Sequence, residues 1–194
     1  MNMRIRSRWR DGQKPATIED NANALANVAC RIALGYAKKL HAEQFDYKHD
    51  SQRVAVICEY LAFLVHLADR WAYGRMDNAQ RVAFITGVGR ETARYLQQNQ
   101  ADIMGPGEYR KAYLQMLNAR MSEYAATRFE EDGTPGYSAV RCLGDRVQDA
   151  MGESQTNRWV IDQVMEIDAL EVTSHLRKAM ENLLDNKLRS KRSR

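Results

Sequence analysis

The sequence has few of the residues that covalent frameworks require, with three cysteines and three prolines among 194 residues. The cysteines Cys30, Cys58 and Cys142 lie far apart, and no two form a C-x-x-C pair. An odd number of widely spaced cysteines argues against a disulfide framework and predicts reduced thiols in the cytoplasm. A chain of this length can bury a core without disulfide or metal cross-links.

Long hydrophobic runs are also missing. The longest apolar run, residues 54–67, is interrupted by Glu59 and His66, and it is too short to cross a bilayer, so we expect no membrane span. The basic N-terminus has no apolar stretch behind it, which argues against a secretory signal. The arginine-rich start would also suit an organellar transit peptide, although a solvated tail explains it more simply.

Charge is distributed unevenly along the chain. The formal net charge is +4 and the pI is about 9.0, values that raise the question of a nucleic-acid or anionic partner. Residues 1–14 carry a net +4 and residues 187–194 a net +5, so residues 15–186 carry −5. We therefore predict an acidic helical domain at 15–186 with a basic, flexible tail at each end.

The spacing of apolar residues indicates helices throughout the domain. Apolar positions recur every three or four residues from about Thr17 to Leu40, over 50–73, from 77 to about 100, around 114–125, over 137–151 and over 157–185. The three prolines, Pro15, Pro106 and Pro135, fall between these segments, and no segment alternates with a period of two. The sequence predicts an all-α, single-domain antiparallel bundle of about six helices.

One segment, Val82–Arg90, resembles the strand and glycine-rich turn that open short-chain dehydrogenases. Glu91 and Ala93 stand where further glycines would be needed, and no strand flanks the segment, so we interpret it as helix. Its small residues would let a neighbouring helix approach closely. Apolar side chains on two sides of this helix predict that it is sandwiched, either within the monomer or at an oligomer interface.

A few acidic and imidazole side chains form a candidate metal site. Carboxylates and histidines on facing helices build the metal sites of helical bundles, with Fe, Mn or Zn as the metal. The candidates, taken from the second and sixth helices, are Glu59, His66, Asp168, Glu171 and His175. A helical wheel places the first two opposite the apolar stripe of their helix, which predicts a solvent-exposed face. It places Asp168, Glu171 and His175 at the flank of the apolar stripe of their own helix.

Three functions remain open from the sequence. The first is a non-catalytic cytoplasmic protein that acts through a protein partner or as a homo-oligomer, and it is favoured because no coherent catalytic set is found. The second is a metal-dependent bundle enzyme that uses the five residues above. The third is nucleic-acid binding through the basic tails, in which Arg residues alternate with other residues around Trp9 and could contact phosphates and bases.

Overall fold

The computed structural model describes residues 16–192, and side chains for residues 16–184. Five helices are followed by one long helical segment, and the described residues form no strand beyond two isolated bridges. The all-α prediction is confirmed. The helices are α1 (Ile18–Ala42), α2 (Asp50–Ala72), α3 (Asn78–Met104), α4 (Tyr109–Ala125) and α5 (Tyr137–Met151), and the last segment comprises η1 (Asn157–Trp159), α6 (Val160–Gln163), η2 (Val164–Asp168) and α7 (Ala169–Arg192).

The helix ends follow the local sequence. Thr17 and Asp20 form a capping box at the start of α1, in which the Thr17 amide donates to the Asp20 carboxylate at 2.9 Å and the Asp20 amide donates to Thr17 Oγ1 at 3.1 Å. Asp77 caps α3 in the same position. Gly105 and Gly152 follow α3 and α5 with positive φ, a conformation that glycine adopts without strain.

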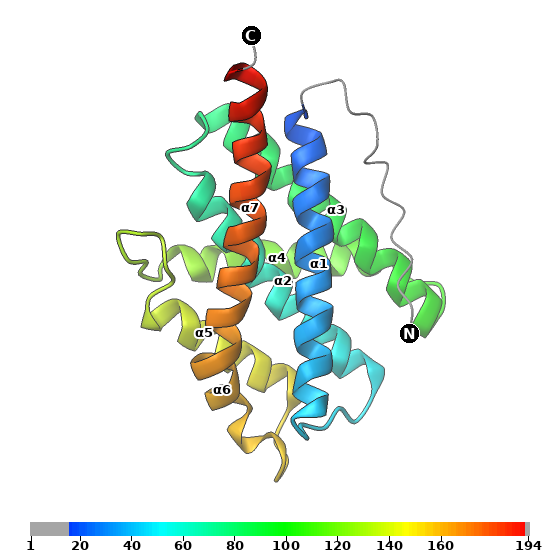
Figure 1. Ribbon diagram of the computed structural model, residues 1–194. Coiled ribbons are helices and arrows are strands. Elements are labelled where there is room, and N and C mark those ends of the chain that lie inside the picture. The colour runs from blue at the N-terminus through cyan, green and yellow to red at the C-terminus, as the bar shows by residue number, and fades with distance from the viewer. Residues whose placement is uncertain (1–15, 193–194) are drawn as a thin grey trace.

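The helix α2 is the centre of the core. It contacts α1, α3, α4, α5 and α7, while α1 and α7 run side by side along the long axis and α4 lies across it (Figure 1). By length and composition α2 could cross a membrane, but 67% of its most apolar window is buried inside the structure. Burial of this kind is what a core helix requires, so the apolar character of α2 is accounted for by packing.

The helix α3 is sandwiched within one chain. A Cβ at Gly87 would lie 2.8 Å from Cβ of Ala22 on α1, and a Cβ at Gly89 would lie 3.3 Å from Leu117 on α4. The close approach predicted for the small residues is therefore present on two sides. Because α1 and α4 cover both faces, the two-sided apolar pattern of α3 no longer argues for an oligomer.

The last helix differs from the single regular helix expected over 157–185. It begins as a 3₁₀ turn at η1, and η2 is a π-helical turn in which the amide of Ala169 donates to the carbonyl of Val164. α7 then continues to Arg192, so residues 187–192 are helical where the sequence suggested a flexible tail. The predicted N-terminal tail, residues 1–14, lies outside the described residues.

Candidate functional site

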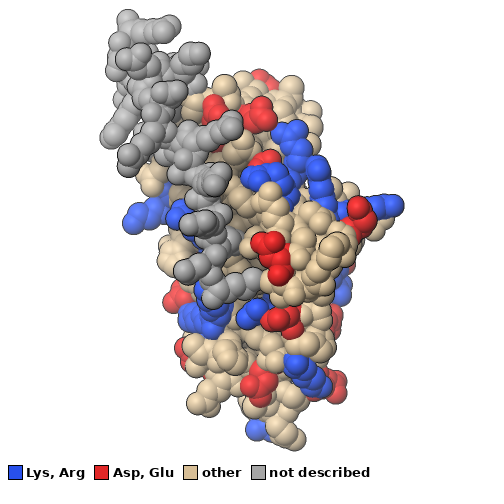
Figure 2. Space-filling model, turned by 90° about the vertical axis from the view of Figure 1, so that its right-hand side faces the viewer, with Lys and Arg blue, Asp and Glu red and all other residues tan. Residues whose placement is uncertain are grey.

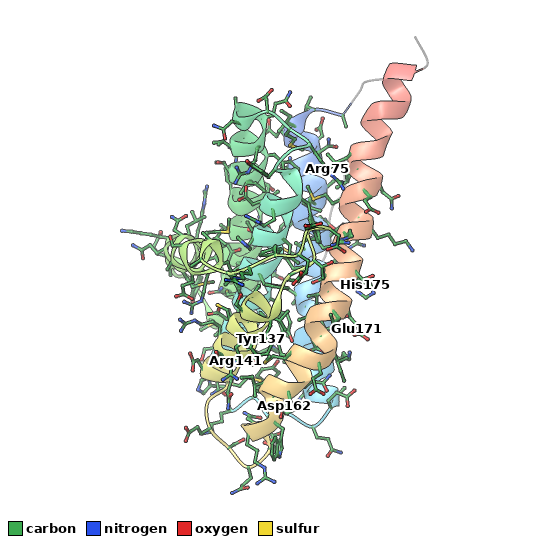
Figure 3. The ribbon with its side chains drawn as sticks, turned by 90° about the vertical axis from the view of Figure 1, so that its left-hand side faces the viewer. Arg75, Tyr137, Arg141, Asp162, Glu171 and His175 are labelled. Atoms are coloured by element: carbon green, nitrogen blue, oxygen red, sulfur yellow. The ribbon has the colours of Figure 1, made fainter. Side chains whose placement is uncertain are left out.

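Three of the five candidate metal ligands lie in one polar network between α1, α2 and α7. The network, which we call the Asp168 cluster, consists of Tyr36, Lys39, Tyr60, Gln163, Asp168, Glu171 and His175. Four of its members, Tyr36, Lys39, Tyr60 and Gln163, were not among the candidates from the sequence, because their partners lie on other helices. Figure 3 shows Glu171 and His175 on α7.

Asp168 is the buried end of the cluster. It is the last residue of the π-helical turn and is fully buried. The Tyr60 hydroxyl donates to Oδ2 at 2.7 Å, Gln163 donates to Oδ1 at 3.2 Å, and Lys39 Nζ lies 3.3 Å from Oδ1. Burial raises the pKa of Asp168, and these contacts oppose part of the rise. Burial of the carboxylate is therefore compensated by specific partners on other helices.

The outer part of the cluster reaches the surface. Lys39 Nζ donates to Glu171 at 2.6 Å, the Tyr36 hydroxyl donates to the same carboxylate oxygen at 2.9 Å, and Nδ1 of His175 lies 3.4 Å from the Tyr36 oxygen. The hydrogen bond from Lys39 lowers the pKa of Glu171, and the bond from Tyr36 acts in the same direction. The carboxylate of Glu171, the ammonium group of Lys39 and the phenol of Tyr36 meet here, but they are hydrogen-bonded to one another.

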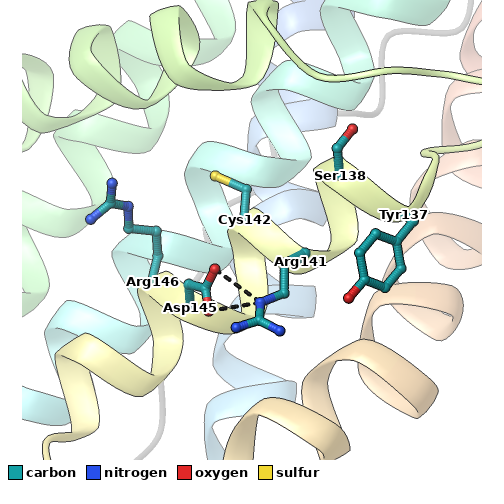
Figure 4. A pocket seen from close by; sticks show the side chains of 6 residues that line it. All are labelled: Tyr137, Ser138, Arg141, Cys142, Asp145 and Arg146. Carbon is teal, nitrogen blue, oxygen red and sulfur yellow. Dashed lines mark hydrogen bonds and ion pairs between the residues drawn. The ribbon is translucent and has the colours of Figure 1, made fainter.

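The two best-defined hollows on the described surface are not lined by any residue of the Asp168 cluster. The larger, of about 430 Å³, lies along α5 (Figure 4). The smaller, of about 130 Å³, lies beside Trp71, Arg75 and Arg177. Because a substrate needs a concave site beside the reacting groups, the arrangement of the cluster favours a role in fastening α7 to α1 and α2.

Glu59 is buried, not exposed as the helical wheel predicted. Its carboxylate is held by the guanidinium of Arg120 on α4 in a two-point contact at 2.7 and 2.8 Å, and the residue is only 6% exposed. Arg120 also contacts Glu123 at 3.0 Å, and the hydrogen bonds that Arg120 donates to Glu59 raise the pKa of Arg120. The pair joins α2 to α4 in a geometry that favours an ion pair.

His66 is also buried, contrary to the same prediction. Its ring lies 5.3 Å from the rings of Tyr124 and Phe129, and neither ring nitrogen has a hydrogen-bond partner among the described residues. Burial lowers its pKa to about 4, with smaller effects from Asp69, which raises the pKa, and Arg70, which lowers it. His66 is therefore a neutral ring packed in an aromatic environment.

The five candidate residues do not converge on one point. Within the part of the chain whose side chains are described, no three His, Cys, Asp or Glu side chains are placed to hold a metal ion. Glu59 is bound to Arg120 and Asp168 to Tyr60, so each carboxylate already has a partner of the protein's own. The shared Fe, Mn or Zn site that the metal hypothesis required is not formed by these residues.

The face of the molecule in Figure 2 bears on whether basic residues gather outside the predicted basic segments, residues 1–14 and 187–194. Lys and Arg side chains alternate there with Asp and Glu over the described residues, so that face carries no continuous basic area. Nucleic-acid binding proteins present their basic groups together on one face. The nucleic-acid hypothesis is based on residues 1–14, which lie outside the described part of the chain, and on residues 187–194, and the face in Figure 2 adds no support to it.

A different feature is an exposed apolar surface beside the larger hollow. We call it the α5–η2 face and define it by the exposed side chains Tyr137, Arg141, Trp159, Asp162, Glu166, Ile167 and Leu170. Seven large hydrophobic side chains are exposed among the described residues, and four of them lie on this face: Tyr137 at 72%, Trp159 at 59%, Leu170 at 57% and Ile167 at 42%. The other three lie at the end of α2 and on α3.

The backbone geometry explains why these residues share a face. A Cβ at Gly144 of α5 would lie 2.9 Å from side-chain carbons of Ile161 and Met165, so α5 and the α6–η2 segment pack closely. In Figure 3 Tyr137 and Arg141 of α5 and Asp162 of α6 lie on the same side of the molecule. Trp159, Asp162, Glu166 and Leu170 of the packed segment are exposed to solvent.

Comparison of the chain with protein-family models, with curated proteins and with solved structures finds no match. The functional proposal therefore depends on the surface of this chain and its chemistry.

Proposed function

We propose that this protein acts by binding a protein partner through the α5–η2 face, without catalysis of its own. The observation that carries the proposal is that four of the seven exposed large apolar side chains, Tyr137, Trp159, Ile167 and Leu170, belong to α5 and to the helical segment that packs against it. Exposed apolar groups are common singly, and several of them on neighbouring elements are more typical of an interaction site. Tyrosine and tryptophan are also the residues that most often dominate binding energy in interfaces.

The rest of the structure favours binding over catalysis. The carboxylates with catalytic potential are engaged with Arg120, Lys39 and tyrosine hydroxyls, and the larger hollow lies on α5, where it borders the α5–η2 face at Tyr137 and Arg141. A shallow hollow next to protruding aromatic side chains suits a protein surface better than a small substrate. We also propose a reducing, cytoplasmic location, supported by the three unpaired cysteines.

Site-specific photo-crosslinking tests the proposed function. A photoreactive phenylalanine derivative is placed at Leu170 of the full chain, and the matched control carries it at Val82, which is exposed to a similar degree at 58% but lies on α3. We expect a discrete crosslinked protein product from position 170, whether with another protein or with a second copy, and none from position 82. Equal products from both positions, or none from position 170, would contradict the proposal.

A further inference from the structure

We propose that the partner bound by the α5–η2 face presents lysine or arginine side chains beside apolar ones, as a basic amphipathic helix of another protein does. This inference rests on the proposed function, because it uses the same face and names the chemistry of its partner. It follows from the charges of the segment that carries Trp159, Ile167 and Leu170, and from the pairing of the charges next to it.

The helical segment of this face combines exposed apolar side chains with carboxylates. Residues 159–171 contain four Asp or Glu residues and no Lys or Arg. Trp159, Ile167 and Leu170 are exposed at 59%, 42% and 57%. Asp162 and Glu166 are also exposed, and both stand between Trp159 and Leu170 in the chain. The surface that a partner meets here is therefore apolar and negatively charged.

Two of these four carboxylates have no ionic partner among the described side chains. Asp168 is buried beside Lys39, and Glu171 contacts the same ammonium group at 2.6 Å. Asp162 and Glu166 are exposed, and no described cation lies within 4.0 Å of either carboxylate. A cation on a partner can therefore pair with them without breaking a described ion pair.

The cations of α5 beside the larger hollow do not offset this charge. Arg141 pairs with Asp145 on its own helix at 2.9 Å (Figure 4). Arg146 contacts Glu123 at 3.0 Å and Asp149 at 3.3 Å. These two guanidinium groups are matched by three carboxylates of the same chain, so α5 contributes no excess of positive charge to the face.

One further cation stands at the edge of the segment. Arg158 precedes Trp159, and its guanidinium carbon lies 5.2 Å from the centroid of the Trp159 ring. It is the only Lys or Arg in residues 153–171, where five Asp or Glu residues occur. The excess of negative charge therefore remains when Arg158 is included.

The combination of negative charge and apolar surface decides between classes of partner. An apolar strip alone would also suit a membrane surface, but anionic lipid headgroups repel carboxylates. The phosphates of nucleic acids repel them in the same way. Complementary charges at an interface speed association and fix the orientation of the partner. A protein helix that carries cations beside its apolar face satisfies both requirements.

Fluorescence anisotropy of a labelled peptide tests this chemistry with the full chain. The probe is an amphipathic peptide built from leucine and lysine at helical spacing, and the comparison peptide carries glutamate in place of every lysine. The chain is expected to bind the lysine peptide with an affinity that falls as salt is added. It is expected to bind the glutamate peptide at least about tenfold more weakly, because attraction is replaced by repulsion.

Variants of the segment locate the contact. In the double variant Asp162→Lys/Glu166→Lys the dissociation constant for the lysine peptide is expected to rise by about tenfold, because two weak attractions become repulsions. Leu170→Ser is expected to raise it by about threefold or more, because apolar contact area is lost. Circular dichroism of each variant shows whether a loss of binding reflects a loss of fold.

The matched control is the double variant Asp102→Lys/Glu108→Lys. Both residues are exposed, neither has a described cation within 4.0 Å, and they flank Met104, which is 45% exposed. The control changes the net charge by the same amount as the test variant, but where α3 is followed by α4. Its dissociation constant for the lysine peptide is expected to change by less than about twofold, because distant charges are screened.

Several results would overturn the inference. Equal binding of the lysine and glutamate peptides, or no binding of the lysine peptide, shows that this face does not select a basic partner. Equal weakening in the test and control variants shows that only the net charge of the chain matters. An unchanged affinity in Leu170→Ser shows that the apolar side chains of the segment do not take part.

The photo-crosslinking experiment separates this inference from the proposed function. A product with another protein that forms equally well in the Asp162→Lys/Glu166→Lys background keeps the binding role and removes the basic partner. A product of twice the mass of the chain does the same, because it identifies a second copy as the occupant. A crosslink to residues 1–14 of the same chain, or no product from position 170 together with no binding of the lysine peptide, removes both.

Discussion

Replacement of His66 by phenylalanine is expected to remove a defined part of the pH dependence of stability. The folded-state pKa of His66 is about 4, against about 6.5 in an unfolded chain. Between these values the unfolded chain binds a proton that the folded chain does not, so stability falls as the pH falls. The contribution is fully present above about pH 6.5, has lost about 2 kcal/mol at pH 5, and has lost about 3 kcal/mol below pH 4.

Phenylalanine preserves an aromatic ring beside Tyr124 and Phe129 and removes two ring nitrogens that have no partner among the described residues. A buried polar atom without a hydrogen bond costs about 1–3 kcal/mol, so the variant is expected to be at least as stable as the natural chain at pH 7. Its advantage then grows by about 2 kcal/mol on going to pH 5. All other titrating groups are common to both chains and cancel in the difference.

Urea unfolding followed by circular dichroism at 222 nm, at fixed protein concentration and at several pH values from 7 to 4.5, measures this difference. The matched control His41→Phe changes an exposed histidine of α1 and shows how much of the effect comes from replacing any histidine by phenylalanine. A His66→Phe variant whose stability difference from the natural chain is the same at pH 7 and pH 5 would refute the reasoning. Nuclear magnetic resonance titration of the His66 ring gives its pKa directly.

Two further predictions concern packing. Arg120→Met leaves the buried carboxylate of Glu59 without a cation and is expected to lower the free energy of unfolding in urea by about 3–5 kcal/mol. Glu59→Met should lower it less, because Arg120 keeps its contact with Glu123 at 3.0 Å. A double variant as unstable as Arg120→Met alone would contradict this. Gly87→Ala brings a Cβ to 2.8 Å from the Cβ of Ala22 on α1 and should lower the free energy of unfolding by about 1–3 kcal/mol. In the control Gly35→Ala the new Cβ has nothing within 4 Å, and the free energy of unfolding should rise by about 0.5–1 kcal/mol. Equal effects at the two glycines would show that α1 and α3 do not approach as described.

Local features of the fold could be predicted from the sequence because they depend on residues close together in the chain. The capping box of Thr17 and Asp20 needs only a spacing of three, and the separation of helices needs only prolines and glycines at the right places. The small size of Gly87 and Gly89 also allowed a close approach to α3 to be predicted, although the residues that make the approach, Ala22 and Leu117, lie far away in the chain and could not be named from the sequence.

The burial of Glu59 and His66 could not be predicted in the same way. A helical wheel detects one apolar stripe, but α2 is surrounded by five other helices, so even its polar side faces protein. Two residues of α4 make the burial of that polar side possible, because Arg120 pairs with Glu59 and Tyr124 stacks on the ring of His66. These partners lie about sixty residues away in the chain, and a single sequence carries no signal that connects them.

The π-helical turn at η2 ends at Asp168, one of the three candidates that lie in one polar network. A wheel of constant pitch placed Asp168 on the flank of its helix, whereas the extra residue in the turn accompanies full burial of Asp168 against Tyr60. Turns of this kind are frequent at functional sites, but here the adjoining groups are bonded to one another. On the opposite side of the same segment Glu166, Ile167 and Leu170 are exposed. This irregular segment thus fixes α7 to the core on one side and leaves Glu166, Ile167 and Leu170 exposed on the other. Its exposed side is therefore the better place to seek the protein partner.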